Sequence, residues 1–127
     1  MRATGTIVGI GFDMVEIGRV DAAIRRWERR FLDRLYTVEE QACCRGQASS
    51  LAGRLAAKEA VLKAMGTGLR FGNWREIAVT GDALGAPRVT ISGRLAEEAR
   101  CRGIEGFLVS ITHTGDLAAA VALARGG

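Results

Sequence analysis

Length, composition and charge limit what this chain can be. Its 127 residues and 13.5 kDa suit one domain that buries roughly two thirds of its unfolded surface, so a single domain over residues 1–127 is predicted. The 48% apolar and 25% charged residues are typical of globular proteins and argue against disorder. A net charge of +4 and a pI near 9.5 favour an anionic partner: a nucleotide, a phosphate ester, an acidic protein or a nucleic acid.

Cysteine usage and hydropathy indicate the compartment. Three cysteines, two of them adjacent at Cys43 and Cys44, make a poor disulfide framework and lack the paired spacing of a zinc site. They are predicted to be reduced thiols in a cytoplasmic protein. No long apolar run precedes Asp13, and the apolar segment at 117–124 is far shorter than the ~20 residues that cross a bilayer. We therefore expect a soluble, unprocessed protein without a membrane partner.

The first predicted elements are a glycine-lined strand and a basic helix. Residues 7–13 alternate as a strand does, with Gly9, Gly11 and Asp13 on the face opposite Val8, Ile10 and Phe12. Glycines in a strand indicate that another group approaches it closely. Residues 17–30 follow a helical period, with arginines along another side. This side is a solvated face, a dock for an acidic protein or, third, a nucleic-acid contact.

The next segment holds the helix around which the rest of the chain is organised. Thr37 and Glu40 form a capping-box pattern for a short helix that ends near Gly46. A long helix over about 50–65 follows, with Ser49 or Ser50 as cap and Gly66 at its end. One face of it carries Ala52, Ala56, Glu59, Ala60 and Lys63. Glu59 and Lys63 are spaced as a surface ion pair, but the alanines indicate that a backbone or a ligand approaches this face.

The last third of the chain alternates strands and a helix. Strands at 77–80 and 88–92 form a hairpin through a turn at 82–87, and a helix over 93–102 follows. A strand over 107–113 ends at His113, and a last strand over 117–124 returns after a turn. We predict an α+β fold: a small, mostly antiparallel sheet packed on the long helix. A histidine at a strand end is usually a surface or structural residue. The polar residues beside His113 favour a functional role more than its position alone does.

Asp13, Glu59, Lys63 and His113 together suit a hard-cation phosphate site. Two carboxylates are what Mg²⁺ usually takes from protein, with water and phosphate oxygens as its other ligands. A lysine there would neutralise charge on a transferring phosphate or protonate the leaving group. Spacing alone does not bring residue 13 near residue 59.

Four blocks, residues 9–19, 51–68, 85–87 and 109–114, resemble the signature blocks of the holo-[acyl-carrier-protein] synthases and occur in the same order. These enzymes are 4′-phosphopantetheinyl transferases, which move the phosphopantetheine arm of coenzyme A onto a serine of apo acyl carrier protein and release adenosine 3′,5′-bisphosphate. The resemblance implies the 4′-phosphopantetheinyl transferase-like fold and a magnesium-dependent enzyme that supports fatty acid or polyketide biosynthesis. It implies an acyl carrier protein and coenzyme A as partners, and no nucleic acid.

The resemblance also implies roles for single residues. Asp13 and Glu59 match the magnesium ligands, Lys63 the active-site lysine and His113 a catalytic-site histidine near the coenzyme phosphates. Further coenzyme contacts fall on Arg54, Gly66, Pro87 and Thr112, and carrier docking on Arg19, Arg26, Arg29 and Arg30. Since Arg54 lies about 140° round the helix from Glu59, we expect it to contact a coenzyme bound by a neighbouring subunit of a homotrimer. The helix alanines are expected to leave room for coenzyme A, and Lys58 is expected to be structural.

Some residues depart from the family pattern. Leu55 and Val61 stand where phenylalanine is usual, and Ala86 replaces a common lysine, which affects one coenzyme contact and not the activity. Two other functions are considered. A non-enzymatic basic module that binds nucleic acid or an acidic protein would leave Asp13 and Glu59 unexplained. A catalytically silent homologue could act as a structural subunit.

Overall fold

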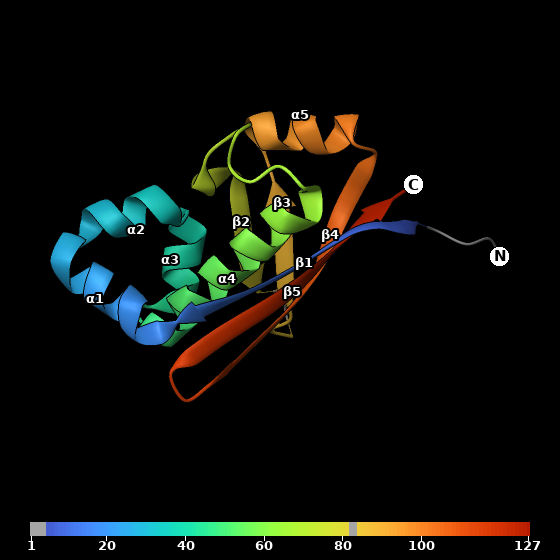
Figure 1. Cartoon of the computed structure of the whole chain (residues 1–127). Coiled ribbons are helices and arrows are strands. Elements are labelled where there is room, and N and C mark those ends of the chain that lie inside the picture. The colour runs from blue at the N-terminus through green and yellow to red at the C-terminus, as the bar shows by residue number, and fades with distance from the viewer. Residues whose placement is uncertain (1–4, 82–83) are drawn as a thin grey trace.

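The computed structural model describes residues 5–81 and 84–127. In chain order these residues form β1 (Thr6–Glu16), α1 (Ile17–Trp27), α2 (Arg29–Leu35), α3 (Val38–Cys44), α4 (Ala48–Met65), the 3₁₀ turn η1 (Trp74–Glu76), β2 (Ile77–Gly81), β3 (Pro87–Ile91), α5 (Gly93–Cys101), β4 (Ile104–Thr114) and β5 (Leu117–Gly126). Figure 1 shows α4 at the centre, α1–α3 clustered beyond one of its ends, and the long strands β1, β4 and β5 crossing it. The predicted α+β class with antiparallel sheets is confirmed. The predicted hairpin turn at 82–87 lies partly outside the described residues, which omit 82–83.

A three-stranded antiparallel sheet in the order β1-β5-β4 packs on α4, while β2 and β3 form a separate hairpin. The central strand, β5, turns only alanines toward the helix: Ala118, Ala120, Ala122 and Ala124. On α4, the matching residues Ala52, Ala56 and Ala60 are fully buried. The expectation that the helix alanines leave room for coenzyme A is therefore wrong, because they form the close contact between helix and sheet.

The glycines of β1 allow the same close approach. A Cβ atom added at Gly9 would overlap the carbonyl oxygen of Ala64, and one added at Gly11 would overlap that of Ala60. The prediction that another group approaches this strand closely is confirmed, and the group is the backbone of α4.

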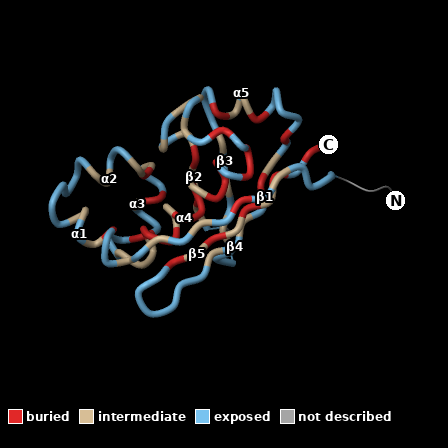
Figure 2. The backbone as a smooth tube through the Cα atoms, viewed as in Figure 1, coloured by how far each residue is buried: buried red, intermediate tan, exposed pale blue. Residues whose placement is uncertain are grey.

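The outer face of the sheet is apolar and exposed. Ile10, Phe12 and Met14 on β1 and Leu108 on β4 are each more than half exposed. Figure 2 shows this alternation as pale blue and tan stretches along the same strands that contribute red, buried residues toward α4. In the described part of the chain, the apolar side chains of β1 that face away from the glycines are left exposed.

The boundaries of α4 differ from the prediction at one end. It begins at Ala48, and its cap residue is Gln47, which makes no side-chain capping hydrogen bond. The predicted caps, Ser49 and Ser50, lie inside the first turn. At the other end Gly66 adopts the left-handed conformation (φ 80°), as predicted for a glycine that ends a helix.

The single helix predicted over 17–30 is two helices. At Glu28 the backbone turns to φ 50° and ψ −127°, so α1 ends at Trp27 and α2 begins at Arg29. This turn lets Phe31, Leu32 and Leu35 pack against the cluster of Val20 and Tyr36. The residues of α2 continue the helical pattern of α1, which is why the break was not predicted.

A buried ion pair joins α3 to α4. Lys58 Nζ lies 2.6 Å from Glu40 Oε1, and both side chains are fully buried. Lys58 also donates to the carbonyl oxygens of Leu35 and Trp74, while Glu40 accepts from the backbone N–H of Val79 at 2.7 Å. Burial lowers the pKa of Lys58, and the Glu40 carboxylate opposes that shift. Lys58 is structural, as expected.

No helix among residues 5–81 and 84–127 is long and apolar enough to cross a membrane.

Candidate active site

Three of the predicted site residues meet between β1 and α4. Asp13 follows Gly11 by two residues, so its side chain leaves the same face of β1 and points toward the helix. Lys63 Nζ donates to Asp13 Oδ1 at 3.0 Å and to the Phe12 carbonyl oxygen at 3.1 Å. Glu59, one helical turn before Lys63, is close enough to Asp13 for that carboxylate to raise its pKa. The fold thus brings together residues whose proximity spacing alone could not predict.

The ion pairs differ from the simplest expectation. In the described part of the chain, Lys63 pairs with Asp13 and not with Glu59 four residues before it. The Lys63 side chain is 57% exposed and the Asp13 side chain 15%, so the lysine reaches outward over a largely buried carboxylate. Its ammonium group therefore stands at the mouth of the site.

Asp13 and Glu59 together would carry two negative charges when ionised, whereas Lys63 supplies one positive charge beside them. Burial, with the hydrogen bond and charge of Asp13, raises the pKa of Glu59 to about 7, although Lys63 opposes the shift. Among the described residues, none donates a hydrogen bond to the buried Asp13 Oδ2. An orphaned buried oxygen beside a second carboxylate fits a divalent cation.

The protein alone supplies few ligands at this point. Among residues 5–81 and 84–127 no group of three or more His, Cys, Asp or Glu side chains is close enough to hold a metal ion. Asp13 and Glu59 fit Mg²⁺ because this ion keeps several waters and binds through one or two carboxylates plus substrate phosphates. The donor set is therefore that of a metal site completed by a phosphorylated ligand.

A second cluster lies at the opposite edge of the sheet. Arg54, Pro87 and His113 line a pocket of about 230 Å³ together with Ser49 and Ser50. Arg54 Nε is buried and has no hydrogen-bond partner among the described residues, so the arginine that lines this pocket carries a donor free for an anion. His113 is on β4 and Asp13 is on β1, which are separated by β5.

Two predicted coenzyme residues lie apart from this pocket. Thr112 precedes His113 on β4 and therefore points to the other, exposed side of the sheet. Gly66 ends α4 beside the guanidinium of Arg102, at the opposite end of the helix from Ser49 and Ser50. One subunit thus gathers Arg54, Pro87 and His113 but neither Gly66 nor Thr112.

Comparison with known proteins decides the family. The model of the 4′-phosphopantetheinyl transferase superfamily matches residues 9–122. A holo-[acyl-carrier-protein] synthase of Desulforudis audaxviator is 43% identical over 123 residues, which cover 94% of each chain. The chain belongs to the holo-[acyl-carrier-protein] synthase family.

Solved holo-[acyl-carrier-protein] synthases share its fold. The enzyme of Neisseria meningitidis is 33% identical with a TM-score of 0.85, over 94% of this chain and 98% of that one. The enzyme of Helicobacter pylori, solved in complex with coenzyme A, is 31% identical with a TM-score of 0.83, over 91% and 98%. The family and enzyme class predicted from the sequence blocks are confirmed.

In this member of the family, the four predicted docking arginines are exposed on α1 and α2. Arg29 is held by Asp33 at 2.8 Å and by Gln41 at 2.9 Å, and Arg19 lies 3.8 Å from Glu16. Arg26 and Arg30 flank the ring of Trp27, with guanidinium carbons 4.9 and 5.7 Å from its centroid. Sequence reasoning did not single out Trp27, which places an exposed aromatic ring amid the basic surface.

Sequence reasoning also missed the apolar pocket beside Glu59. This pocket, of about 320 Å³, is lined by the end of β1, by α1, and by Phe31 and Leu55. The signal for it was Leu55, which the sequence analysis noted as a departure from the family pattern and which lines the pocket. The pocket brings Glu59 beside Arg19 of α1.

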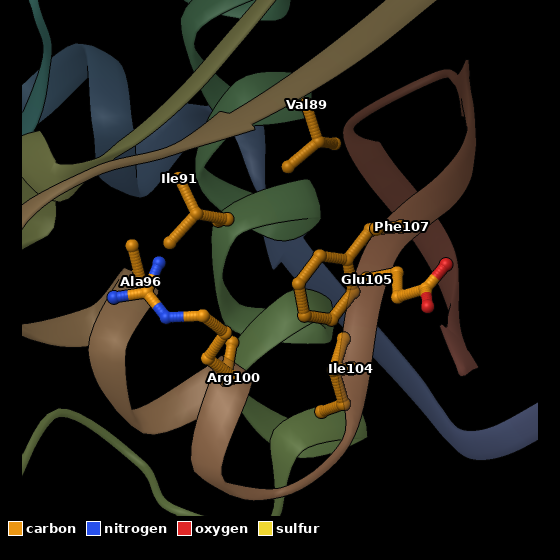
Figure 3. A pocket seen from close by; sticks show the side chains of 9 residues that line it. Val89, Ile91, Ala96, Arg100, Ile104, Glu105 and Phe107 are labelled. Atoms are coloured by element: carbon orange, nitrogen blue, oxygen red, sulfur yellow. The ribbon is translucent and has the colours of Figure 1, made fainter. Parts of the chain in front are cut away.

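A further pocket, of about 360 Å³, lies between β3, α5 and the start of β4. Figure 3 shows Val89, Ile91, Ile104 and Phe107 around it, with the Arg100 side chain across one side and the Glu105 carboxylate directed away. None of its lining residues is a predicted site residue, and its walls are mainly aliphatic and aromatic. It is therefore not a second candidate active site.

Proposed function

We propose that this chain transfers the 4′-phosphopantetheine group of coenzyme A to a serine of apo acyl carrier protein, with Mg²⁺ held by Asp13 and Glu59. The observation that carries the proposal is the meeting of Asp13, Glu59 and Lys63 in a member of this family. The coenzyme A complex of the Helicobacter pylori relative supports the choice of donor. We also propose that residues 1–127 act as one domain, in the cytoplasm, in fatty acid or polyketide biosynthesis.

In the proposed reaction, the serine oxygen attacks the β-phosphorus of coenzyme A. The bond from that phosphorus to the bridging oxygen breaks, and adenosine 3′,5′-bisphosphate leaves with the electron pair. When bound, Mg²⁺ supplies charge neutralisation on the diphosphate. Lys63 offers its ammonium group to the departing phosphate. The serine proton passes to a water or a carboxylate of the site.

The proposal includes a homotrimer whose sites lie between subunits. Asp13, Glu59 and Lys63 of one subunit would face Arg54, Pro87 and His113 of the next around one coenzyme. The position of these clusters at opposite edges of one sheet supports this arrangement. The exposed apolar outer face of the sheet supplies an interface for it. Gly66 and Thr112 keep the coenzyme role that the family pattern gives them, with contacts divided between subunits.

We further propose that an acidic carrier protein docks on α1 and α2 through Arg19, Arg26, Arg29 and Arg30. Their exposure and the net charge of +4 support this role. Exposed charges of this kind govern the encounter rate and its salt dependence more than the final affinity. Trp27 adds a rigid apolar contact at the centre of the same surface.

The test measures the intact mass of several apo carrier proteins after incubation with the enzyme, coenzyme A and Mg²⁺. We expect a gain equal to one phosphopantetheine arm, abolished by chelation of the metal. Glu59→Gln, which keeps the side-chain shape and removes its charge, should lower the rate at least ~100-fold, because transition-state charge would be left uncompensated. Glu97→Gln, on the exposed side of α5, is the control and should keep the wild-type rate.

Wild-type transfer by Glu59→Gln would overturn the metal assignment. No mass gain with any carrier, together with salt-sensitive binding of DNA or RNA, would favour the basic non-enzymatic module instead.

A further inference from the structure

At Gly11, two residues before Asp13, the backbone of β1 contacts the backbone of α4 with no side chain between them. A Cβ atom at Gly11 would overlap the carbonyl oxygen of Ala60 and come too close to the backbone nitrogen of Ala64. Asp13 leaves β1 on the same face two residues later, and Glu59 and Lys63 flank Ala60 on the helix. Gly11 therefore lies at the point where the separation of β1 from α4 sets the distances from Asp13 to Glu59 and Lys63.

We propose that Gly11 is a positioning residue whose missing side chain sets the separation at which Asp13 meets Glu59 and Lys63. This inference rests on the proposed function, since the reacting groups that it positions are those of the phosphopantetheinyl transfer.

The atoms that oppose a side chain at Gly11 cannot rotate away. They belong to the backbone of α4, so no change of rotamer makes room. Behind Gly11, the strand is paired in regular register with Ala122 of β5, so it cannot bend locally out of the sheet. A methyl group is accommodated only if strand and helix part by about 1 Å, given ordinary non-bonded distances. Catalytic groups need to be held within about 0.5 Å, so this displacement exceeds the tolerance of the site.

Gly9 provides a natural comparison on the same strand. A Cβ there would also overlap backbone, at Ala64, but the β1–β5 register shifts between Ile7 and Gly9. An irregular pairing leaves the strand free to adjust, and Gly9 is four residues from Asp13. The two glycines thus meet similar obstruction but differ in their coupling to the carboxylate.

The test compares Gly11→Ala with Gly9→Ala. Binding of Mn²⁺ alone is followed by electron paramagnetic resonance, and transfer kinetics and thermal unfolding are measured on the same proteins. Gly11→Ala should weaken Mn²⁺ binding by about tenfold or more. It should also lower kcat about 100-fold with a smaller change in the KM for the carrier, because the proposed docking arginines lie on α1 and α2 and not at the contact between β1 and α4. Gly9→Ala should lose thermal stability yet keep Mn²⁺ affinity within about twofold.

A rescue variant distinguishes positioning from packing. Asp13→Glu lengthens the side chain by one methylene, about the displacement expected, so it should recover part of the Mn²⁺ affinity in the Gly11→Ala protein. Asp13→Glu alone should weaken Mn²⁺ binding. No recovery in the double variant would count against a separation mechanism.

Wild-type Mn²⁺ affinity and kcat in folded Gly11→Ala would overturn the proposal, as would equal losses in both glycine variants. If Gly11→Ala does not fold, the comparison is made in a Glu28→Gly background, where a glycine relieves the left-handed backbone of residue 28. If the wild type binds no Mn²⁺, the metal role in the proposed function fails. Crystal structures of the wild type and Gly11→Ala then test the positioning role, which an unchanged separation of Asp13 from Glu59 would overturn.

Discussion

In the described part of the chain, Lys63 is the cationic side chain that contacts the Asp13 and Glu59 pair. It donates to Asp13 and to the Phe12 carbonyl oxygen. A proton therefore competes with the proposed divalent ion for the same carboxylate pair. Residue types and spacing predicted that these side chains belong to a phosphate site, and the family blocks led us to propose Asp13 and Glu59 as metal ligands. The sequence could not reveal that Asp13 Oδ2 is buried without a donor, because that depends on the close approach of α4.

Metal affinity should rise with pH up to about 7 and then level off. Because the pKa of Glu59 is raised to about 7, a proton must leave before the cation binds, so affinity falls about tenfold per unit below that pH. Calorimetric titration with Mg²⁺ between pH 5.5 and 8.5 measures this. A pH-independent affinity over this range would contradict the prediction.

The same shift fixes how the stability of the metal-free protein varies with pH. The fold raises the pKa of Glu59 above its ordinary value of 4.5, so its contribution is fully present below that pH and is lost as pH rises through about 7. Glu59→Gln serves as the control, since it should remove this component of the pH dependence.

At the scale of elements, the capping box of α3 does more than start a helix. Its Glu40 also binds Lys58 and the N–H of Val79, which ties α3 to α4 and β2. Thr37 and Glu40 were predictable as a cap, whereas the partner of Lys58 was not, because no local pattern identifies a contact between distant segments. For the same reason the helix break at Glu28 was missed: periodicity reports which side is apolar and not the backbone angles of one charged residue.

Lys58→Met should lower the free energy of unfolding by about 3–5 kcal/mol, since it leaves the Glu40 carboxylate buried and unpaired. Urea denaturation measures the loss. Arg25→Met, which breaks the exposed ion pair with Asp21 on α1, is the control and should cost less than about 1 kcal/mol. Lys58→Met/Glu40→Gln should recover part of the loss, because glutamine removes the unpaired charge. Equal losses in Lys58→Met and Arg25→Met would show that the buried pair adds nothing.

At the scale of the whole molecule, α4 covers one side of the sheet, and the described residues leave the apolar side chains on its other side exposed. The alternation of β1 identified both of its faces, but it suggested no reason for the apolar face to lie outward, since an apolar face is ordinarily buried in its own core. The clusters around Asp13 and around Arg54 are likewise separate in one subunit. The helical angle between Arg54 and Glu59 anticipated this separation, whereas the split of Thr112 from His113 follows from strand alternation.

Phe12→Asp should dissociate the proposed trimer, because it places a charge in the centre of the outer sheet face. Sedimentation velocity should show three times the subunit mass for the wild type and a smaller species for the variant, with transfer activity lost in parallel. Val38→Asp, at an exposed apolar residue of α3, should leave the mass unchanged. An undiminished mass for Phe12→Asp would rule out this face as the interface.

The alanines and glycines between β1, β5 and α4 have a consequence for mutational surveys. Alanine scanning measures the effect of removing side-chain atoms. It therefore skips the alanines, and the glycines have no side chain to remove. Here the separation of β1 from α4 depends on the absence of larger side chains. A scan that adds one methyl or methylene group at each small residue would map this contact. It would report on the distances between the site residues instead of on the residues themselves.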